Sequence, residues 1–210
     1  MTSVLARAFR DCVGEFATGV TVVTAESEHG PAGMTLNSFT SVSLEPLLVL
    51  VSLGHGSRTL GVARASGRFA VSILHRAQQQ VALDFAERAA PFPAQHVVRD
   101  RDGYLTVPGA AATLRCLVRE AIPAGDHDLL LGEVESIDHG GGEPLIFHRG
   151  RLGGNRPQSF ARGQLSIPGN LLLLVRRLRI CRGRLRYRHP SQSARRRRLR
   201  QPWIFSSHDR

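Results

Sequence analysis

Apolar residues at the start of the chain follow first a helical and then a strand spacing. An apolar stripe recurs every three or four positions within residues 3–17, at Leu5, Phe9, Val13 and Phe16. That spacing predicts one amphipathic helix. The β-branched segment 20–25 then predicts a strand, which ends at a turn over residues 28–31 and continues into a strand pair.

The middle of the chain is dominated by strand-length apolar runs. The nearly continuous run 46–53 predicts a central strand that is buried on both faces. A short helix with Ser57 as its N-cap follows, then a strand over 67–74 and a helix over 78–88. Further strands are expected at 112–120, 128–138 and 145–148, after a region of mainly loop at 89–110. This order predicts a mainly β fold, a barrel or sandwich with a few helices.

Charge divides the chain into two parts. The net charge is +11, and all 28 basic residues are Arg. Residues 1–163 hold 15 Arg against 16 acidic residues and net to −1, whereas residues 164–210 hold 13 Arg against Asp209 and net to +12. We therefore expect a folded domain over 1–163 and a disordered or non-catalytic Arg-rich tail over 164–210.

Cysteine content and hydropathy indicate the compartment. Cys12, Cys116 and Cys181 are odd in number and widely spaced, so they predict neither a disulfide framework nor a thiolate zinc site. We expect Cys12 and Cys116 to be buried and inert. No apolar run approaches the roughly 20 residues of a membrane span, and the N-terminus lacks the features of an export signal. The prediction is a cytoplasmic protein that does not cross a membrane.

Two polar segments are candidates for ligand binding. Residues 33–43 are rich in hydroxyl and amide side chains, which suit the polar edge of a flat heteroaromatic ligand. Composition alone favours an exposed polar strand there. Ser57, Arg58 and Thr59, at the start of a predicted helix, offer free amides, hydroxyls and a guanidinium to a phosphate. An ordinary N-cap beside an exposed Arg fits them equally well.

Histidine is the remaining candidate for chemistry. His127 lies between Asp126 and Asp128 and precedes an apolar run, so it could project from a strand end into a cleft. By itself, such a residue is more often structural. No close His and Cys set has the spacing of a metal site, and neither GxGxxG nor GxSxG is present.

Five blocks in one order resemble the flavin reductase family, which has the FMN-binding split β-barrel fold. They are FATGVTVVT (16–24), GMTLNSFTSVSLEP (33–46), SGRFAVS (66–72), GDH with LGEV (125–134), and HRGR (148–151). Any one block is a weak signal, but the five together, within about residues 7–152, are highly specific.

The resemblance implies an NAD(P)H:flavin oxidoreductase that passes hydride from NADH or NADPH to FMN or FAD. Its partner would be a flavin-dependent monooxygenase that takes up the diffusing reduced flavin, and the family usually forms homodimers with the pocket near the subunit interface. His127 would lie on the nicotinamide side as the catalytic residue. The remaining cofactor-binding residues implied by the resemblance are Thr35, Leu36, Asn37, Ser38, Val51, Ser52, Leu53, Ser57, Arg58, Thr59, Phe85, Arg88, His148, Arg149, Gly150 and Arg151.

Two other functions stay open at this point. A domain of this kind could retain FMN for a different redox partner. Alternatively, the Arg-rich tail could bind a nucleic acid or another anionic surface, although the near-neutral domain has no such tendency. The sequence distinguishes neither FMN from FAD nor NADH from NADPH.

Overall fold

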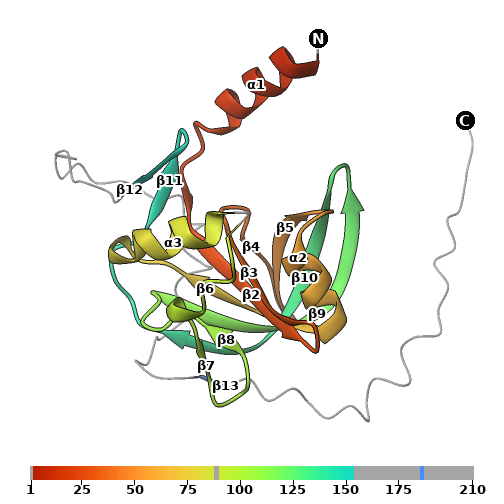
Figure 1. The fold of residues 1–210 in the computed structure, drawn as a ribbon, viewed down its shortest axis with the longest axis vertical. Coiled ribbons are helices and arrows are strands. Elements are labelled where there is room, and N and C mark those ends of the chain that lie inside the picture. Colours follow the sequence, from red (N-terminus) through yellow and green to blue (C-terminus); the bar gives the residue numbers. More distant parts are fainter. Residues whose placement is uncertain (1, 88–89, 154–184, 187–210) are drawn as a thin grey trace, which may run out of the picture.

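The computed structural model describes residues 2–87, 90–153 and 185–186 (Figure 1). The helices are α1 (Thr2–Val13), α2 (Arg58–Ser66) and α3 (Gln79–Ala86), with 3-10 turns at Arg76–Gln78 and Ala94–His96. The strands are β1 (Thr18–Gly19), β2 (Thr21–Ser27), β3 (Gly30–Leu36), β4 (Thr40–Leu44), β5 (Leu47–Gly54), β6 (Arg68–Ile73), β7 (Val98–Arg99), β8 (Leu105–Thr106), β9 (Ala112–Ala124), β10 (His127–His139), β11 (Ile146–His148), β12 (Arg151–Gly153) and β13 (Leu185–Arg186).

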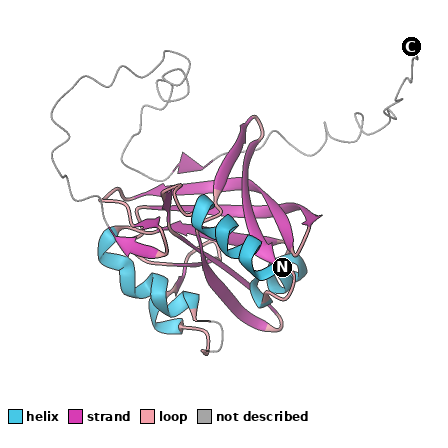
Figure 2. Ribbon diagram, turned by 90° about the horizontal axis from the view of Figure 1, so that it is seen from above, coloured by secondary structure: helices cyan, strands magenta, loops and turns pink. Residues whose placement is uncertain are grey.

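One large antiparallel sheet forms the body of the molecule. Its strands run in the order β3-β2-β6-β9-β10-β5-β4, and β13 pairs with the far part of β10. The sheet is open between β3 and β4, the two ends of that order. Long twisted strands therefore wrap around the core while the helices lie outside them (Figure 2). A separate sheet, β1-β11-β12, lies at the base of α1, and β7 pairs with β8.

The expected doubly buried strand is β6 rather than β5. Along β5, buried and half-buried residues alternate, so the prediction for 46–53 was wrong. The physical reason is that only one face of β5, with Val49, Val51 and Leu53, packs into the larger core cluster. By contrast, β6 lies between β2 and β9 and buries four consecutive residues, Phe69 to Ser72. Side chains on both of its faces therefore belong to the core.

Two apolar clusters fill the interior. The larger one joins β2, β5, β6, β9 and β10 to α2, and it includes Val51, Leu53 and Phe69. The smaller one lies beside α3 and includes Phe85 and Leu145. Within the first cluster, β10 passes so close to Phe69 that only a glycine fits at position 132: a Cβ there would lie 2.8 Å from Cε1 of Phe69.

Helix α1 stands away from this core (Figure 1). The predicted helix is confirmed over Thr2–Val13, but it ends before Phe16. Its apolar stripe is exposed, with Leu5 74% and Phe9 64% accessible. Cys12 is exposed as well, so the expectation that it is buried was wrong, because α1 packs on no core. Cys116 is fully buried, as expected, and burial raises the pKa of its thiol.

Candidate active site

The N-terminus of α2 presents free amides directly after β5. The side chain of Ser57 accepts a hydrogen bond from the amide of Leu60 at 3.4 Å, which confirms Ser57 as the N-cap. Its hydroxyl also donates to Sδ of Met34 on β3 at 3.2 Å. The first turn of α2 contains no acidic residue. The positive end of the helix dipole is therefore available to an anion.

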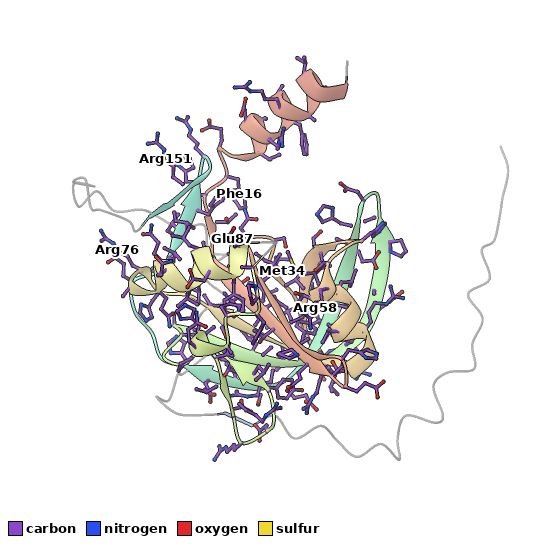
Figure 3. All side chains as sticks on the ribbon, viewed as in Figure 1. Phe16, Met34, Arg58, Arg76, Glu87 and Arg151 are labelled. Atoms are coloured by element: carbon purple, nitrogen blue, oxygen red, sulfur yellow. The ribbon has the colours of Figure 1, made fainter. Side chains whose placement is uncertain are left out.

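Arg58 and Thr59 differ in exposure. Arg58 is exposed, and its guanidinium reaches the β2–β3 turn, where Nη2 donates to the carbonyl oxygen of His29 at 3.4 Å (Figure 3). Thr59 is only 3% accessible and packs into the molecule. Of the two side chains, Arg58 is thus the one that is free to reach an anion at the surface.

The end of β5 is left open along one edge. Strand β4 pairs with β5 only as far as Leu50. At Ser52, the backbone of β5 instead forms hydrogen bonds with the side chain of Ser38. The Ser38 hydroxyl accepts from the Ser52 amide at 3.1 Å and donates to the Ser52 carbonyl oxygen at 3.2 Å. Among the described residues no strand pairs with this edge beyond Leu50. The opening lies beside the start of α2, where the chain passes from Gly54 to Ser57.

The other residues predicted around this edge are divided between surface and core. Asn37 is exposed, whereas the Thr35 hydroxyl donates to the carbonyl oxygen of Ala82 on α3 at 2.7 Å. The side chains of Leu36, Val51 and Leu53 are buried in the larger core cluster. Any contact that these three make with a ligand would therefore involve their backbone.

His127 is brought to the same strand end from the opposite part of the sequence. As the first residue of β10, it pairs with Gly54, the last residue of β5. Its Nδ1 atom lies 2.7 Å from Oδ1 of Asp126, and this hydrogen bond lowers the pKa of the Asp126 carboxyl. Its Nε2 faces Gly54, where a Cβ would lie 3.9 Å away. His127 thus lies at a strand end, as predicted.

A group of residues that the sequence did not single out lies beside His127. The carboxylate of Asp128 is 3.0 Å from Nε2 of His55 and 3.2 Å from Nη1 of Arg64. An open depression of about 560 Å³ extends from this group between α2 and the β9–β10 hairpin. It is lined by His55, Ser57, Leu60, Gly61, Arg64, Pro123 and Asp128.

Phe85 and Arg88 were expected from the helix after β6. Phe85 is 4% accessible and makes an edge-to-face contact with Phe92, with 5.7 Å between the ring centroids. It also packs so closely on Gly33 that a Cβ there would lie 2.7 Å from its ring. The structure thus places the Phe85 side chain in the core. Arg88 lies outside the described residues.

The segment His148 to Arg151 is not adjacent to α2 within one chain. It forms the turn between β11 and β12, with Arg149 in the left-handed region at φ 48°. The Arg149 guanidinium lies 2.7 Å from a carboxylate oxygen of Glu15, just after α1. Figure 3 shows Arg151 near the base of α1 and apart from Arg58.

Neither metal ligation nor membrane insertion is supported by the described parts of the chain. Residues 2–87 and 90–153 contain no group of three or more His, Cys, Asp and Glu side chains that could hold a metal ion. No helix among the described residues has the length and apolarity needed to cross a membrane.

Comparison with known proteins identifies the family. The Flavin reductase like domain matches residues 13–156. A probable flavin reductase of Rhizobium meliloti (strain 1021) is 39% identical over 168 residues, which cover 77% of this chain and only 54% of that protein. The FMN reductase (NADH) SmoA of Agrobacterium fabrum is 39% identical over 147 residues, or 70% of this chain and 84% of that protein.

A solved structure agrees with the sequence comparison. The styrene monooxygenase flavin reductase of Pseudomonas putida S12 superposes with a TM-score of 0.64 at 39% identity, over 70% of this chain and 97% of that one. The open, mainly β sheet is therefore the split-barrel fold that the sequence predicted. Together these findings show that the chain belongs to the flavin reductase family of oxidoreductases, as its five sequence blocks predicted.

Proposed function

We propose that this chain reduces FMN or FAD with NADH or NADPH and releases the reduced flavin to a flavin-dependent monooxygenase. The observation that carries the proposal is the convergence at the end of β5, where the amides of α2 and the imidazole of His127 lie on either side of Gly54. One strand end can thus hold a flavin by its phosphate and present a histidine to the nicotinamide. The relatives support both the reduction of flavin and its delivery to a monooxygenase: one is an FMN reductase that uses NADH, and another is the flavin reductase of a styrene monooxygenase.

The phosphate-binding part of the site is Ser57, Arg58 and Thr59. A phosphate at the first turn of α2 would meet unpaired amides and a favourable dipole. The exposed Arg58 guanidinium would supply a charge-assisted hydrogen bond. FMN and FAD share this first phosphate, which is why both suit the site.

The ring-binding part is the open edge of β5. A flat isoalloxazine with polar atoms along one side suits the segment Thr35 to Ser38 and the half-buried Ser52. Leu36, Val51 and Leu53 would contact the flavin ring through their backbone groups, since their side chains face the core. When bound, flavin supplies the chemistry of the reaction by accepting a hydride from the reduced nicotinamide.

His127 would orient the nicotinamide. The Asp126 carboxylate is an acceptor, so Nδ1 of His127 carries the proton and donates it. In the neutral ring, Nε2 then has a free lone pair, which can accept a hydrogen bond from a carboxamide N–H group. The protein's contribution to catalysis is thus to place two cofactors in contact.

Two substitutions separate these roles. We expect Arg58→Ala to raise the Kd for flavin about 10- to 100-fold, the equivalent of roughly 1.5–3 kcal/mol for a charged hydrogen bond, while Arg58→Lys loses less. We expect His127→Ala to lower kcat/KM for NADH and to leave the flavin Kd unchanged. Flavin fluorescence quenching and steady-state kinetics measure the two effects. Equal effects of both substitutions on flavin affinity would contradict the assignment.

A homodimer would give α1 a partner. An isolated helix of 12 residues is marginal in water, and the apolar stripe of α1 is exposed. Packing against a second copy would bury it and bring the neighbouring turn His148 to Arg151 toward the other protomer. We expect Phe9→Asp to shift the sedimentation coefficient from dimer to monomer, whereas Arg7→Ala, on the opposite helix face, leaves the dimer intact. A monomeric wild-type protein would refute this part.

The catalytic domain would comprise residues 1–163. The family match ends at residue 156, and the Arg-rich stretch 164–210 lies beyond it. Most of that stretch lies outside the described residues, although Leu185–Arg186 pairs with β10. Truncation after Gly163 should leave flavin reduction intact. Loss of activity in a folded truncated protein would refute the boundary.

The free thiols of Cys12 and Cys116 suit a reducing compartment, so we place the enzyme in the cytoplasm.

A further inference from the structure

Three side chains outside the proposed flavin site form a chain of contacts behind His127. Asp128 is only 5% accessible, and its two carboxylate oxygens have different partners. Oδ2 accepts from Nη1 of Arg64 on α2 at 3.2 Å, and Oδ1 lies 3.0 Å from Nε2 of His55. The buried carboxylate thus connects α2 to the segment between β5 and α2.

His55 continues this chain of contacts to the backbone of His127. Its Nε2 is also 3.0 Å from the carbonyl oxygen of His127. Both neighbours of Nε2 are acceptors, so this nitrogen carries a proton in either charge state of the ring. In addition, the backbone amide of His55 donates to the carbonyl oxygen of Asp126 at 3.1 Å. His55 therefore holds two consecutive residues at the tip of the β9–β10 hairpin.

Apart from the strand pairings of His127 with Gly54 and Ala124, its position at the tip depends on the turn and on side-chain contacts. The turn depends on Gly125, with φ at 68°. The side chain of His127 is 46% accessible, and its acidic partner Asp126 is 94% accessible. A hydrogen bond between two such exposed groups orients the His127 ring but contributes little to the position of the hairpin, because water competes for both groups.

From these contacts we infer that His55 is a positioning residue for His127. It acts through the backbone of the hairpin and is held in turn by Asp128 and Arg64. This inference rests on the proposed role of His127 toward the nicotinamide. Since the His55 side chain is half exposed, its contacts add little to stability. Instead, the contacts of His55 determine the position of the His127 imidazole.

A double-mutant cycle tests the inference. We expect His55→Ala to lower kcat/KM for NADH about tenfold, since a shift of about an ångström is costly to a positioned group, with the flavin Kd unchanged. His55→Gln keeps an N–H donor and should recover most of the loss. The double variant His55→Ala/His127→Ala should be no worse than His127→Ala alone, because both changes remove one function.

The control is His139→Ala, an exposed histidine at the other end of β10. The His139→Ala variant should match the wild type in kcat/KM. The thermal unfolding midpoint of His55→Ala should equal that of His139→Ala. Wild-type kinetics for His55→Ala, or losses that multiply in the double variant, would overturn the positioning role while leaving the role of His127 intact. Unchanged kinetics for His127→Ala would instead refute the proposed function of the histidine, and the inference with it.

Discussion

Asp126 and His127 are adjacent residues at the tip of the β9–β10 hairpin whose side chains bond to each other. The 2.7 Å separation between Oδ1 and Nδ1 fixes the ring orientation and leaves Nε2 directed toward Gly54, at the end of β5. The hairpin thereby places an oriented imidazole beside the end of β5, just before α2 begins. The proposed role of His127 in hydride transfer requires this position of the ring.

Removing the Asp126 carboxylate should loosen the ring without dislodging the hairpin. We predict that Asp126→Ala lowers kcat/KM for NADH about 2- to 10-fold, because the His127 ring loses the hydrogen bond that orients it. Steady-state kinetics at saturating flavin measure this change. Glu28→Gln is the matched control, because Glu28 and His29 form another adjacent, exposed acid–histidine pair. An equal loss in the control would show that the effect is not specific to Asp126.

The close approach of β10 to Phe69 predicts a large packing penalty at Gly132. A Cβ at this position would lie 2.8 Å from Cε1 of Phe69, closer still to Cζ of the same ring, and 3.0 Å from Cβ of Cys116. We expect Gly132→Ala to reduce the free energy of unfolding by about 1–3 kcal/mol. Gly61→Ala on α2, where a Cβ has no atom within 4 Å, should instead stabilise by about 0.5–1 kcal/mol. Urea denaturation of both variants tests the contrast, and a neutral Gly132→Ala would contradict it.

Arg115 should control part of the acid stability of the fold. It is 3% accessible and contacts the carboxylates of Asp100, Asp102 and Asp138. Burial raises the pKa of Asp100, but hydrogen bonds from Arg115 and from the amides of Tyr104 and Asp102 outweigh it and hold that pKa below its usual range. The stabilisation from Asp100 is therefore present above the ordinary Asp pKa of about 3.9 and is lost as pH falls through the folded-state value.

We predict that Arg115→Met costs about 1.5–3 kcal/mol at neutral pH, because it removes the charged hydrogen bonds that the buried guanidinium donates to the partly buried carboxylates of Asp100 and Asp138. It should also flatten the decline of stability below about pH 5, since the pKa of Asp100 would be depressed less once the hydrogen bond and charge of Arg115 are gone. Urea unfolding across pH 3–7 measures both effects. If the variant and the wild type lost stability with the same slope on acidification, this account of Asp100 would be wrong.

Local chemistry was predictable from the sequence, whereas long-range contacts were not. Ser57 was identified as an N-cap because capping depends on the next three residues alone. The difference in burial between β5 and β6 depends on what packs on each face of these strands, and those contacts come from segments far along the chain. Apolar content alone could not reveal that only one face of β5 packs into the core.

The same reason explains the site residues that the sequence missed. His55 follows β5 in a short glycine-rich turn, and its partner His127 is 72 residues away. No spacing rule connects the two, so only the pairing of β5 with β10 shows the contact. The stripe on α1 predicted a helix from its period, but an amphipathic pattern does not specify what covers it. For Cys12 that meant an exposed thiol in place of a buried one.

The most direct test of the central claim is the oxidation of NADH and NADPH by the purified protein, followed by the loss of nicotinamide absorbance. FMN, FAD or no flavin would be added in parallel reactions. The account predicts turnover that depends on added flavin, and the relative rates would identify the preferred nicotinamide and flavin. No turnover with any pair would contradict it: a protein that kept a yellow chromophore would be a flavin-binding domain for another redox partner, and one without flavin would share only the fold.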